Sequence, residues 1–299
     1  MGECDSAGVA LTSNQPGASL LPALGESTSA TSPARPGLVP ATIVLILLTN
    51  DDGIFAPGIA ALERELRQIG EVVVVAPAVE QSGVGHSITF LQPLVAKQVF
   101  DADDQPRGWA VEGSPADSVK LGIFEFCPRR PDVVVSGVNG GLNAGINVLY
   151  SGTVAAAIEG AFFGITSIAC SLEYVEHPNF ARAAQISRHV IEQILRLKKP
   201  EPQLYNLNIP TAAIEQPRGL RVVPMGVSRY GEQFIKRTDP RGRAYYWATN
   251  EPPPQPEGHD TDLTCLTQGY ITLTPLQYNM TRHAALAEME GWRLTLPGE

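Results

Sequence analysis

The chain has 299 residues, of which 43% are hydrophobic and 18% are charged, enough apolar material for a sizeable core and too much for a wholly disordered chain. Its 22 Lys and Arg against 31 Asp and Glu give a net charge of −9, which argues against a protein dedicated to binding nucleic-acid polymers. The longest uninterrupted apolar run, residues 43–48, is far shorter than the roughly 20 residues that span a bilayer. We therefore expect a water-soluble, cytoplasmic protein that does not bind membranes.

Residues 1–41 differ in composition from the rest of the chain. They are rich in Ser, Ala, Gly, Pro and Thr, and they contain no aromatic residue and no periodic apolar pattern. Such a segment cannot bury enough apolar surface to fold by itself. It lacks the basic start and apolar core of a secretory signal, and its single Arg against three acidic residues is unlike a transit peptide. We predict a flexible low-complexity tail, followed by one domain over residues 42–299.

From residue 43 onward, apolar strands alternate with amphipathic helices. Strands are predicted at residues 43–48, 72–75, 133–135, 165–170 and 204–209. Helices are predicted at 57–69 and 178–197, where apolar residues recur at spacings of three and four, and at 153–163, whose small residues suit close packing on a sheet. Uninterrupted apolar runs are typical of strands that are buried on both faces of a parallel sheet. The pattern predicts an α/β fold, a doubly wound, mostly parallel Rossmann-like sheet with right-handed crossovers.

The C-terminal part follows a different pattern. Residues 220–223, 244–247 and 270–274 resemble antiparallel strands, and a proline-rich loop at 252–254 separates them. Too few strands are present to bury an independent core. We therefore predict that residues 220–281 form a hairpin extension of the same domain that serves as an oligomerisation arm.

Four polar segments follow predicted strands or open a predicted helix: residues 50–53, 81–83, 136–139 and 150–153. In doubly wound folds, ligands bind at the carboxyl ends of the strands, where the strand order reverses. Asp51 and Asp52 come directly after a buried strand, so they repel each other unless a cation holds them. Together with hydroxyl and amide oxygens, they make an oxygen-only set of ligands that suits Mg²⁺, Mn²⁺ or Ca²⁺. The alternative is a solvated turn, since Asp-Asp-Gly is common turn chemistry.

The fourth segment places Ser151, Gly152 and Thr153 at the start of a predicted helix. Free backbone N–H groups and the helix dipole favour an anion there, although ordinary N-capping by Ser or Thr explains the same residues. A hard metal and an anion at one sheet edge together indicate a phosphate ester. The chain contains no P-loop, dinucleotide fingerprint or nucleophile elbow, which favours metal-activated water as the nucleophile. A larger residue at Gly152 is then expected to disturb phosphate handling while sparing metal binding.

These residues carry a resemblance to a known family. Residues 47–54, Leu-Leu-Thr-Asn-Asp-Asp-Gly-Ile, resemble the opening motif of the SurE family of survival-protein phosphatases, which are metal-dependent 5'-nucleotidases. The similarity continues in consistent order through the other three polar segments and into 239–247 and 269–276, so it covers about residues 43–281. Residues 113–118 and Asp260 depart from the family pattern in supporting loops, which leaves the substrate preference open.

The resemblance implies the roles of individual residues. One divalent ion per subunit, Mg²⁺ or Mn²⁺, would be held by Asp51, Asp52, Ser82 and Asn139, with the two aspartates also catalytic. Phosphate contacts would come from Asn143, Ser151, Gly152 and Thr153. The family also implies assembly through the hairpin region, as a homodimer or homotetramer.

His86 lies close to Ser82 in the sequence and could protonate a leaving alkoxide as a general acid; the alternative is a hydrogen-bonded loop histidine. The function that we predict is hydrolysis of nucleoside monophosphates to nucleoside and phosphate, with 3'-nucleotides and polyphosphate as further candidate substrates. A nucleotide-binding regulatory module without turnover is the alternative, and a structural oligomerisation protein is a third hypothesis.

Overall fold

The computed structural model describes residues 43–228, 233–249 and 258–297. The tail predicted at residues 1–41 lies outside these residues. No helix in the described part of the chain is both long enough and apolar enough to cross a membrane.

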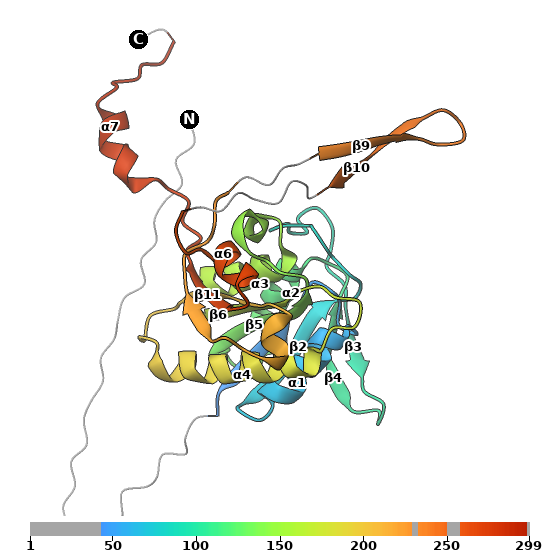
Figure 1. The fold of residues 1–299 in the computed structure, drawn as a ribbon. Helices are drawn as coiled ribbons and strands as arrows, with labels where there is room; N and C mark the ends of the chain where they lie inside the picture. Colours follow the sequence, from blue (N-terminus) through green and yellow to red (C-terminus); the bar gives the residue numbers. More distant parts are fainter. Residues whose placement is uncertain (1–42, 229–232, 250–257, 298–299) are drawn as a thin grey trace, which may run out of the picture. The chain divides into compact units, whose positions relative to one another are not determined.

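A nine-stranded sheet forms the centre of the fold (Figure 1). From one edge to the other its strands are β3 (Ala96–Phe100), β4 (Pro106–Val111), β2 (Glu71–Pro77), β1 (Leu45–Thr49), β5 (Val133–Gly140), β6 (Thr166–Leu172), β7 (Leu204–Ile209), β11 (Ile271–Leu276) and β8 (Leu220–Val222). The six strands from β4 to β7 are parallel to their neighbours, whereas β3 and β11 run antiparallel to β4 and β7. This sheet confirms the predicted doubly wound, mostly parallel fold.

Helices cover both faces of the sheet because successive residues of a strand point to opposite sides. Ile46 and Leu48 of β1 belong to the core beneath α1 (Pro57–Leu66) and α4 (Phe180–Leu197), which pack together. Leu47, between them, belongs to the core beneath α2 (Pro115–Leu121) and α3 (Gly152–Phe162). All three side chains are fully buried. The uninterrupted apolar run of β1 therefore fills two cores at once.

Shorter helices complete the described chain. They are a π-helical turn at Gly122–Phe126, a 3₁₀ turn at Gly145–Leu149, α5 (Ala212–Glu215), α6 (Asp262–Thr267), a second 3₁₀ turn at His283–Ala285 and α7 (Leu286–Glu290).

The C-terminal strands differ in part from the sequence prediction. β8 and β11 do not form a hairpin: they pair in parallel with each other and extend the main sheet at β7. The hairpin consists instead of β9 (Gln233–Thr238) and β10 (Ala244–Thr249), an antiparallel pair that forms a second sheet of two strands. The reason is burial, since Ile271 and Leu273 of β11 pack into the main core whereas β9 and β10 are exposed along almost their whole length.

Candidate metal and phosphate site

The site lies where the strand order of the sheet reverses. From β1 the chain first adds β2 and β4 on one side, and it then crosses to add β5, β6 and β7 on the other. The loops that follow the carboxyl ends of β1 and β5 diverge from each other, and a cavity of about 290 Å³ lies between them. Its lining consists of Asp51, Asp52, Glu80, Ser82, Gly83, Asn139, Gly140, Leu142, Asn143, Asn147, Tyr150 and Ser151. The four polar segments of the sequence therefore meet at the carboxyl ends of the central strands, as predicted.

Two glycines shape the backbone that carries the ligand candidates. Gly53 has φ +98° and its carbonyl accepts a hydrogen bond of 2.9 Å from Asn50 Nδ2, which closes the turn after β1. Gly137 has φ +131°, and a Cβ there would collide with the carbonyl oxygen of Cys170. Only glycine fits either position without strain. The register between β5 and β6 shifts over this stretch, which turns the end of β5 toward the cavity and brings Asn139 into its wall.

Asp51 and Asp52 line the cavity, and each accepts a hydrogen bond from a neighbouring element. Thr153 Oγ1 donates a hydrogen bond of 2.5 Å to Asp51 Oδ1, and the N–H of Gly140 donates one of 3.3 Å to Asp52 Oδ2. Burial raises the pKa of Asp51 above its usual value, against the lowering effect of the Thr153 hydrogen bond. Burial and the neighbouring Asp51 raise the pKa of Asp52 to about 6. No Lys or Arg of the described residues pairs with either carboxylate.

The other oxygen atoms at the cavity suit a hard divalent cation as ligands. Ser82 Oγ donates a hydrogen bond of 2.6 Å to Glu80 Oε1, and Asn139 Nδ2 donates one of 2.7 Å to the Gly141 carbonyl. The amide oxygen of Asn139 is thereby left for a cation. Within the described ranges, no three His, Cys, Asp or Glu side chains are grouped as metal ligands. A metal here would rest on two carboxylates with hydroxyl, amide and water oxygens, a set that suits Mg²⁺ or Mn²⁺ and not zinc.

The start of α3 lies against this carboxylate pair. Ser151 lines the cavity and is the N-cap of α3, where its Oγ accepts a hydrogen bond of 3.1 Å from the N–H of Val154. Gly152 and Thr153 are not among the lining residues, but Thr153 donates its hydrogen bond to Asp51. A Cβ built on Gly152 would lie 2.8 Å from Cβ of Asp51 and 3.0 Å from its Oδ2. The helix start and the metal-ligand candidates are therefore in direct contact.

Asn143 is fixed by a buried network of amide side chains that the sequence pattern does not predict. Its N–H donates to Asn208 Oδ1 at 2.8 Å, and its carbonyl accepts bonds of 2.6 Å and 3.2 Å from Asn206 Nδ2 and Asn208 Nδ2. Its own Nδ2 donates to Ser171 Oγ at 2.9 Å and to Thr153 Oγ1 at 3.4 Å. Asn206 and Asn208 are two residues apart in β7, so both lie on one face of a strand whose other residues are mostly apolar. Two amide side chains on one face of such a strand are the sequence pattern from which this network could have been predicted.

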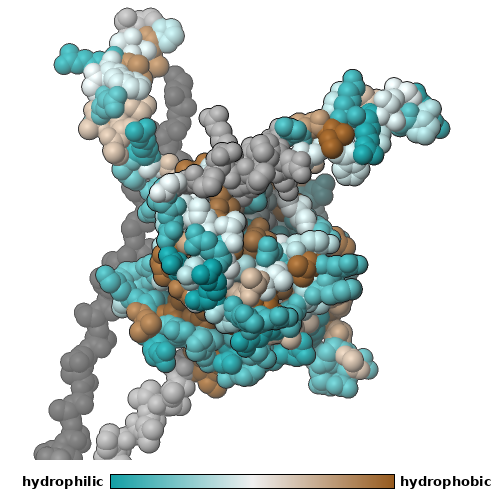
Figure 2. All heavy atoms as spheres, viewed as in Figure 1, coloured by the Kyte–Doolittle hydropathy of each residue, from teal (hydrophilic) through white to brown (hydrophobic). Residues whose placement is uncertain are grey.

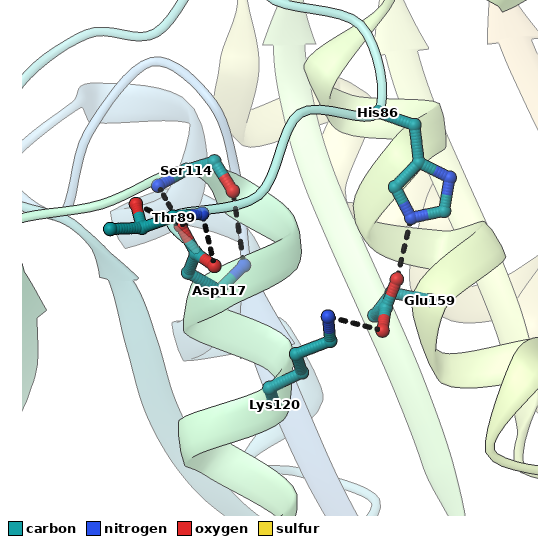
Figure 3. Close-up of polar contacts among 6 residues, drawn as sticks. All are labelled: His86, Thr89, Ser114, Asp117, Lys120 and Glu159. Atoms are coloured by element: carbon teal, nitrogen blue, oxygen red, sulfur yellow. Dashed lines mark hydrogen bonds and ion pairs between the residues drawn. The ribbon is translucent and has the colours of Figure 1, made fainter. Parts of the chain in front are cut away.

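His86 is the one predicted catalytic residue that the structure does not bring to the cavity. Its Nε2 lies 2.5 Å from Oε2 of Glu159 on α3, as Figure 3 shows, and His86 is not part of the cavity lining. This placement is that of a hydrogen-bonded loop histidine. Glu159 itself was not singled out in the sequence, where it is one acidic residue in a helix of small ones.

Comparisons with known proteins show which family the chain belongs to. The family model described as survival protein SurE matches residues 46–232. A protein of Rhodopirellula baltica named 5'-nucleotidase SurE is 58% identical over 250 residues, which are 83% of this chain and 98% of the relative. A Vibrio vulnificus protein of the same name is 43% identical over 248 residues, 83% of this chain and 94% of the relative. The crystal structure of the SurE protein from Aquifex aeolicus superposes with a TM-score of 0.72 at 38% identity, covering 83% of this chain and 99% of that one. The family model, the similar sequences and the shared fold together place this chain in the SurE family.

Proposed function

We propose that this protein is a metal-dependent 5'-nucleotidase, a phosphoric monoester hydrolase that releases phosphate from nucleoside monophosphates. Relatives that match most of the chain carry the name 5'-nucleotidase SurE. The observation that carries the proposal is the pair Asp51 and Asp52, two adjacent carboxylates that face a polar cavity beside the start of α3. Two acidic groups without a paired cation in the described chain are the arrangement that a divalent ion would stabilise.

The first group of cavity residues would bind the metal ion. Asp51, Asp52, Ser82 and Asn139 would hold one Mg²⁺ or Mn²⁺ ion per subunit. A bound ion of this kind polarises phosphoryl oxygens and lowers the pKa of a coordinated water.

The other cavity residues would handle the phosphate. The positive end of the α3 dipole at Ser151 favours the phosphate, and the buried network around Asn143 keeps that side chain at the cavity wall. Preorganised donors of this type stabilise the charge that develops on the phosphoryl oxygens.

The test is phosphate release from AMP, with and without Mn²⁺, by protein that has been stripped of metal with EDTA. A panel that adds other 5'-nucleotides, 3'-nucleotides and polyphosphate defines the substrate class. We expect release from 5'-nucleotides only after metal is added back. Saturable nucleotide binding without release would favour the alternative, a nucleotide-binding regulatory module.

We further propose that the chain assembles as a cytoplasmic homodimer or homotetramer through the hairpin of β9 and β10. Phe234 and Ile235 of β9 and Trp247 of β10 are exposed in this hairpin, and Figure 2 shows hydrophobic side chains on its surface. An isolated two-stranded hairpin is marginally stable in water, so pairing with a second subunit would cover its edges. Light scattering on purified protein tests this, and a monomer at micromolar concentration would contradict it.

A further inference from the structure

The loop of residues 81–89, here called the Ser82 loop, carries one predicted metal ligand and is anchored on both sides of it. Before Ser82, the N–H of Gln81 donates a hydrogen bond of 2.7 Å to the carbonyl of Asp51. After it, the N–H of Gly85 donates one of 3.0 Å to the carbonyl of Tyr150. Only three residues separate these anchors, so the chain has little reach between them. The position of Ser82 therefore depends on how firmly these two anchors are held, and His86 directly follows the second of them.

Two side chains in the second half of the loop point toward the neighbouring helices: Thr89 toward Asp117 of α2, and His86 toward Glu159 of α3 (Figure 3). The backbone N–H of Thr89 lies 3.0 Å from both carboxylate oxygens of Asp117, and its hydroxyl donates to Oδ2 of the same carboxylate at 2.8 Å. Asp117 also accepts a bond of 2.9 Å from the N–H of Ser114, the N-cap of α2. One buried carboxylate thus fixes the loop to the start of α2.

His86 makes the corresponding contact with α3. Its Nε2 is 2.5 Å from Oε2 of Glu159, and the other oxygen of Glu159 is 3.3 Å from Nζ of Lys120 on α2. The side chain of Glu159 is only 6% exposed. Burial by itself would raise its pKa, but the hydrogen bond from His86 and the charge of Lys120 outweigh burial and lower it. Glu159 is therefore a fixed anion that joins the Ser82 loop, α2 and α3.

The geometry assigns a role to this cluster of His86, Lys120 and Glu159: we propose that His86 is a positioning residue that holds the Ser82 loop against α3, so that Ser82 stays in place for the divalent ion. The inference rests on the metal site of the proposed function. An ionised carboxylate only accepts hydrogen bonds, so Nε2 of His86 donates to Glu159 and is not free to protonate a leaving group in the cavity. Since α3 begins at the cavity, the same contact keeps the loop in register with the helix start.

Variants of the intact protein separate positioning from general acid catalysis. His86→Ala removes the contact, His86→Gln keeps a donor for Glu159 but cannot act as a general acid, and Lys120→Met removes a partner of Glu159 without touching the loop. His189→Gln, on the exposed side of α4, is the matched control. Two measurements need no turnover: calorimetric Mn²⁺ binding in the absence of nucleotide, and hydrogen exchange of residues 82–89 in metal-free protein. Phosphate release at saturating Mn²⁺ is the third.

Loss of a group that orients a metal ligand typically weakens metal affinity by about 10- to 100-fold. We expect a loss in this range for His86→Ala, with faster exchange of residues 82–89. Lys120→Met should shift both readouts in the same direction, His86→Gln should restore most of the affinity, and His189→Gln should behave as wild type.

Two results would overturn the assignment. One is wild-type Mn²⁺ affinity and exchange in His86→Ala. The other is loss of turnover in both His86 variants at saturating Mn²⁺ while affinity and exchange stay normal, which is the behaviour of a general acid. If the wild-type protein hydrolyses no nucleotide, the proposed function fails, but the binding and exchange experiments still decide the role of His86.

Discussion

The most informative substitution is Gly152→Ala at the start of α3. The added Cβ would lie 2.8 Å from Cβ of Asp51, 3.0 Å from its Oδ2 and 3.2 Å from Cγ of Pro115. Ordinary van der Waals contact begins at 3.4 Å, so Asp51 has to move by several tenths of an ångström or α3 has to shift. From the sequence we expected a larger side chain here to spare metal binding, since the ligands lie on other loops. The contact with Asp51 reverses that expectation.

The size of the effect follows from the tolerance of metal coordination. Ligand distances in a metal site hold to within about 0.2 Å, so the displacement forced on Asp51 exceeds what the site can absorb. We expect Mn²⁺ affinity to fall by about 10- to 100-fold, as for other changes that disturb the support of a ligand. Overpacking of this kind costs about 1–3 kcal/mol of stability, which leaves a folded protein.

The assay is calorimetric Mn²⁺ binding beside thermal unfolding of the same preparations. Gly140→Ala is the matched control: Gly140 also lines the cavity, but its added Cβ would meet only Cζ of Phe180, at 3.5 Å. We expect the control to bind Mn²⁺ much as wild type does. Wild-type affinity in Gly152→Ala would contradict this reasoning, because it would mean that α3 absorbs the contact or that Asp51 is not a ligand.

Three further predictions concern charge and assembly. In metal-free buffer, Asp52→Asn should raise the melting temperature above pH 6, because it removes a buried carboxylate that Asp51 repels; circular dichroism measures this, and an unchanged temperature would argue against repulsion. The raised pKa of Asp52 fixes the sign of the pH dependence. The folded protein holds this proton more tightly than the unfolded chain, so the group stabilises the fold below about pH 4, and that stability is lost as the pH rises from 3.8 to about 6. This loss of stability is at most about 3 kcal/mol, and it is smaller where water screens the carboxylate. A melting temperature of metal-free wild type that rises between pH 3.8 and about 6, relative to that of Asp52→Asn, would contradict this prediction. Trp247→Ser on β10 should shift assemblies toward monomer without changing the fold, and light scattering that shows an unchanged mass would argue against the arm as an interface.

The parts of the fold that the sequence predicted well are those in which burial and local pattern agree. The run at residues 204–209 is β7 to the residue, and the apolar spacing after Pro57 predicted α1. β3 and β4 at the other edge were not predicted. β3 is almost entirely polar or exposed and β4 contains Gly108, which must pack against Val74 of β2, so neither shows the apolar pattern of a central strand.

In the candidate site, too, some features follow from local sequence patterns and others do not. Asp51, Asp52, Ser82, Asn139, Asn143 and Ser151 come to one cavity because the carboxyl ends of parallel strands share an edge of the sheet. The contact of Gly152 with Asp51 and the pairing of His86 with Glu159 depend on how helices pack across that edge. His86 and Glu159 are 73 residues apart in the chain, and contacts over such a separation leave no local pattern in the sequence.

The central claim is that hydrolysis depends on one divalent ion held by Asp51 and Asp52. The most direct measurement titrates metal-stripped protein with Mn²⁺ and follows bound metal and phosphate release from AMP in the same samples. We predict one ion bound per chain, activity that rises in proportion to that occupancy, and neither binding nor release in Asp51→Asn at the same Mn²⁺ concentrations. Full phosphate release by the stripped protein, or wild-type release by Asp51→Asn, would contradict the account.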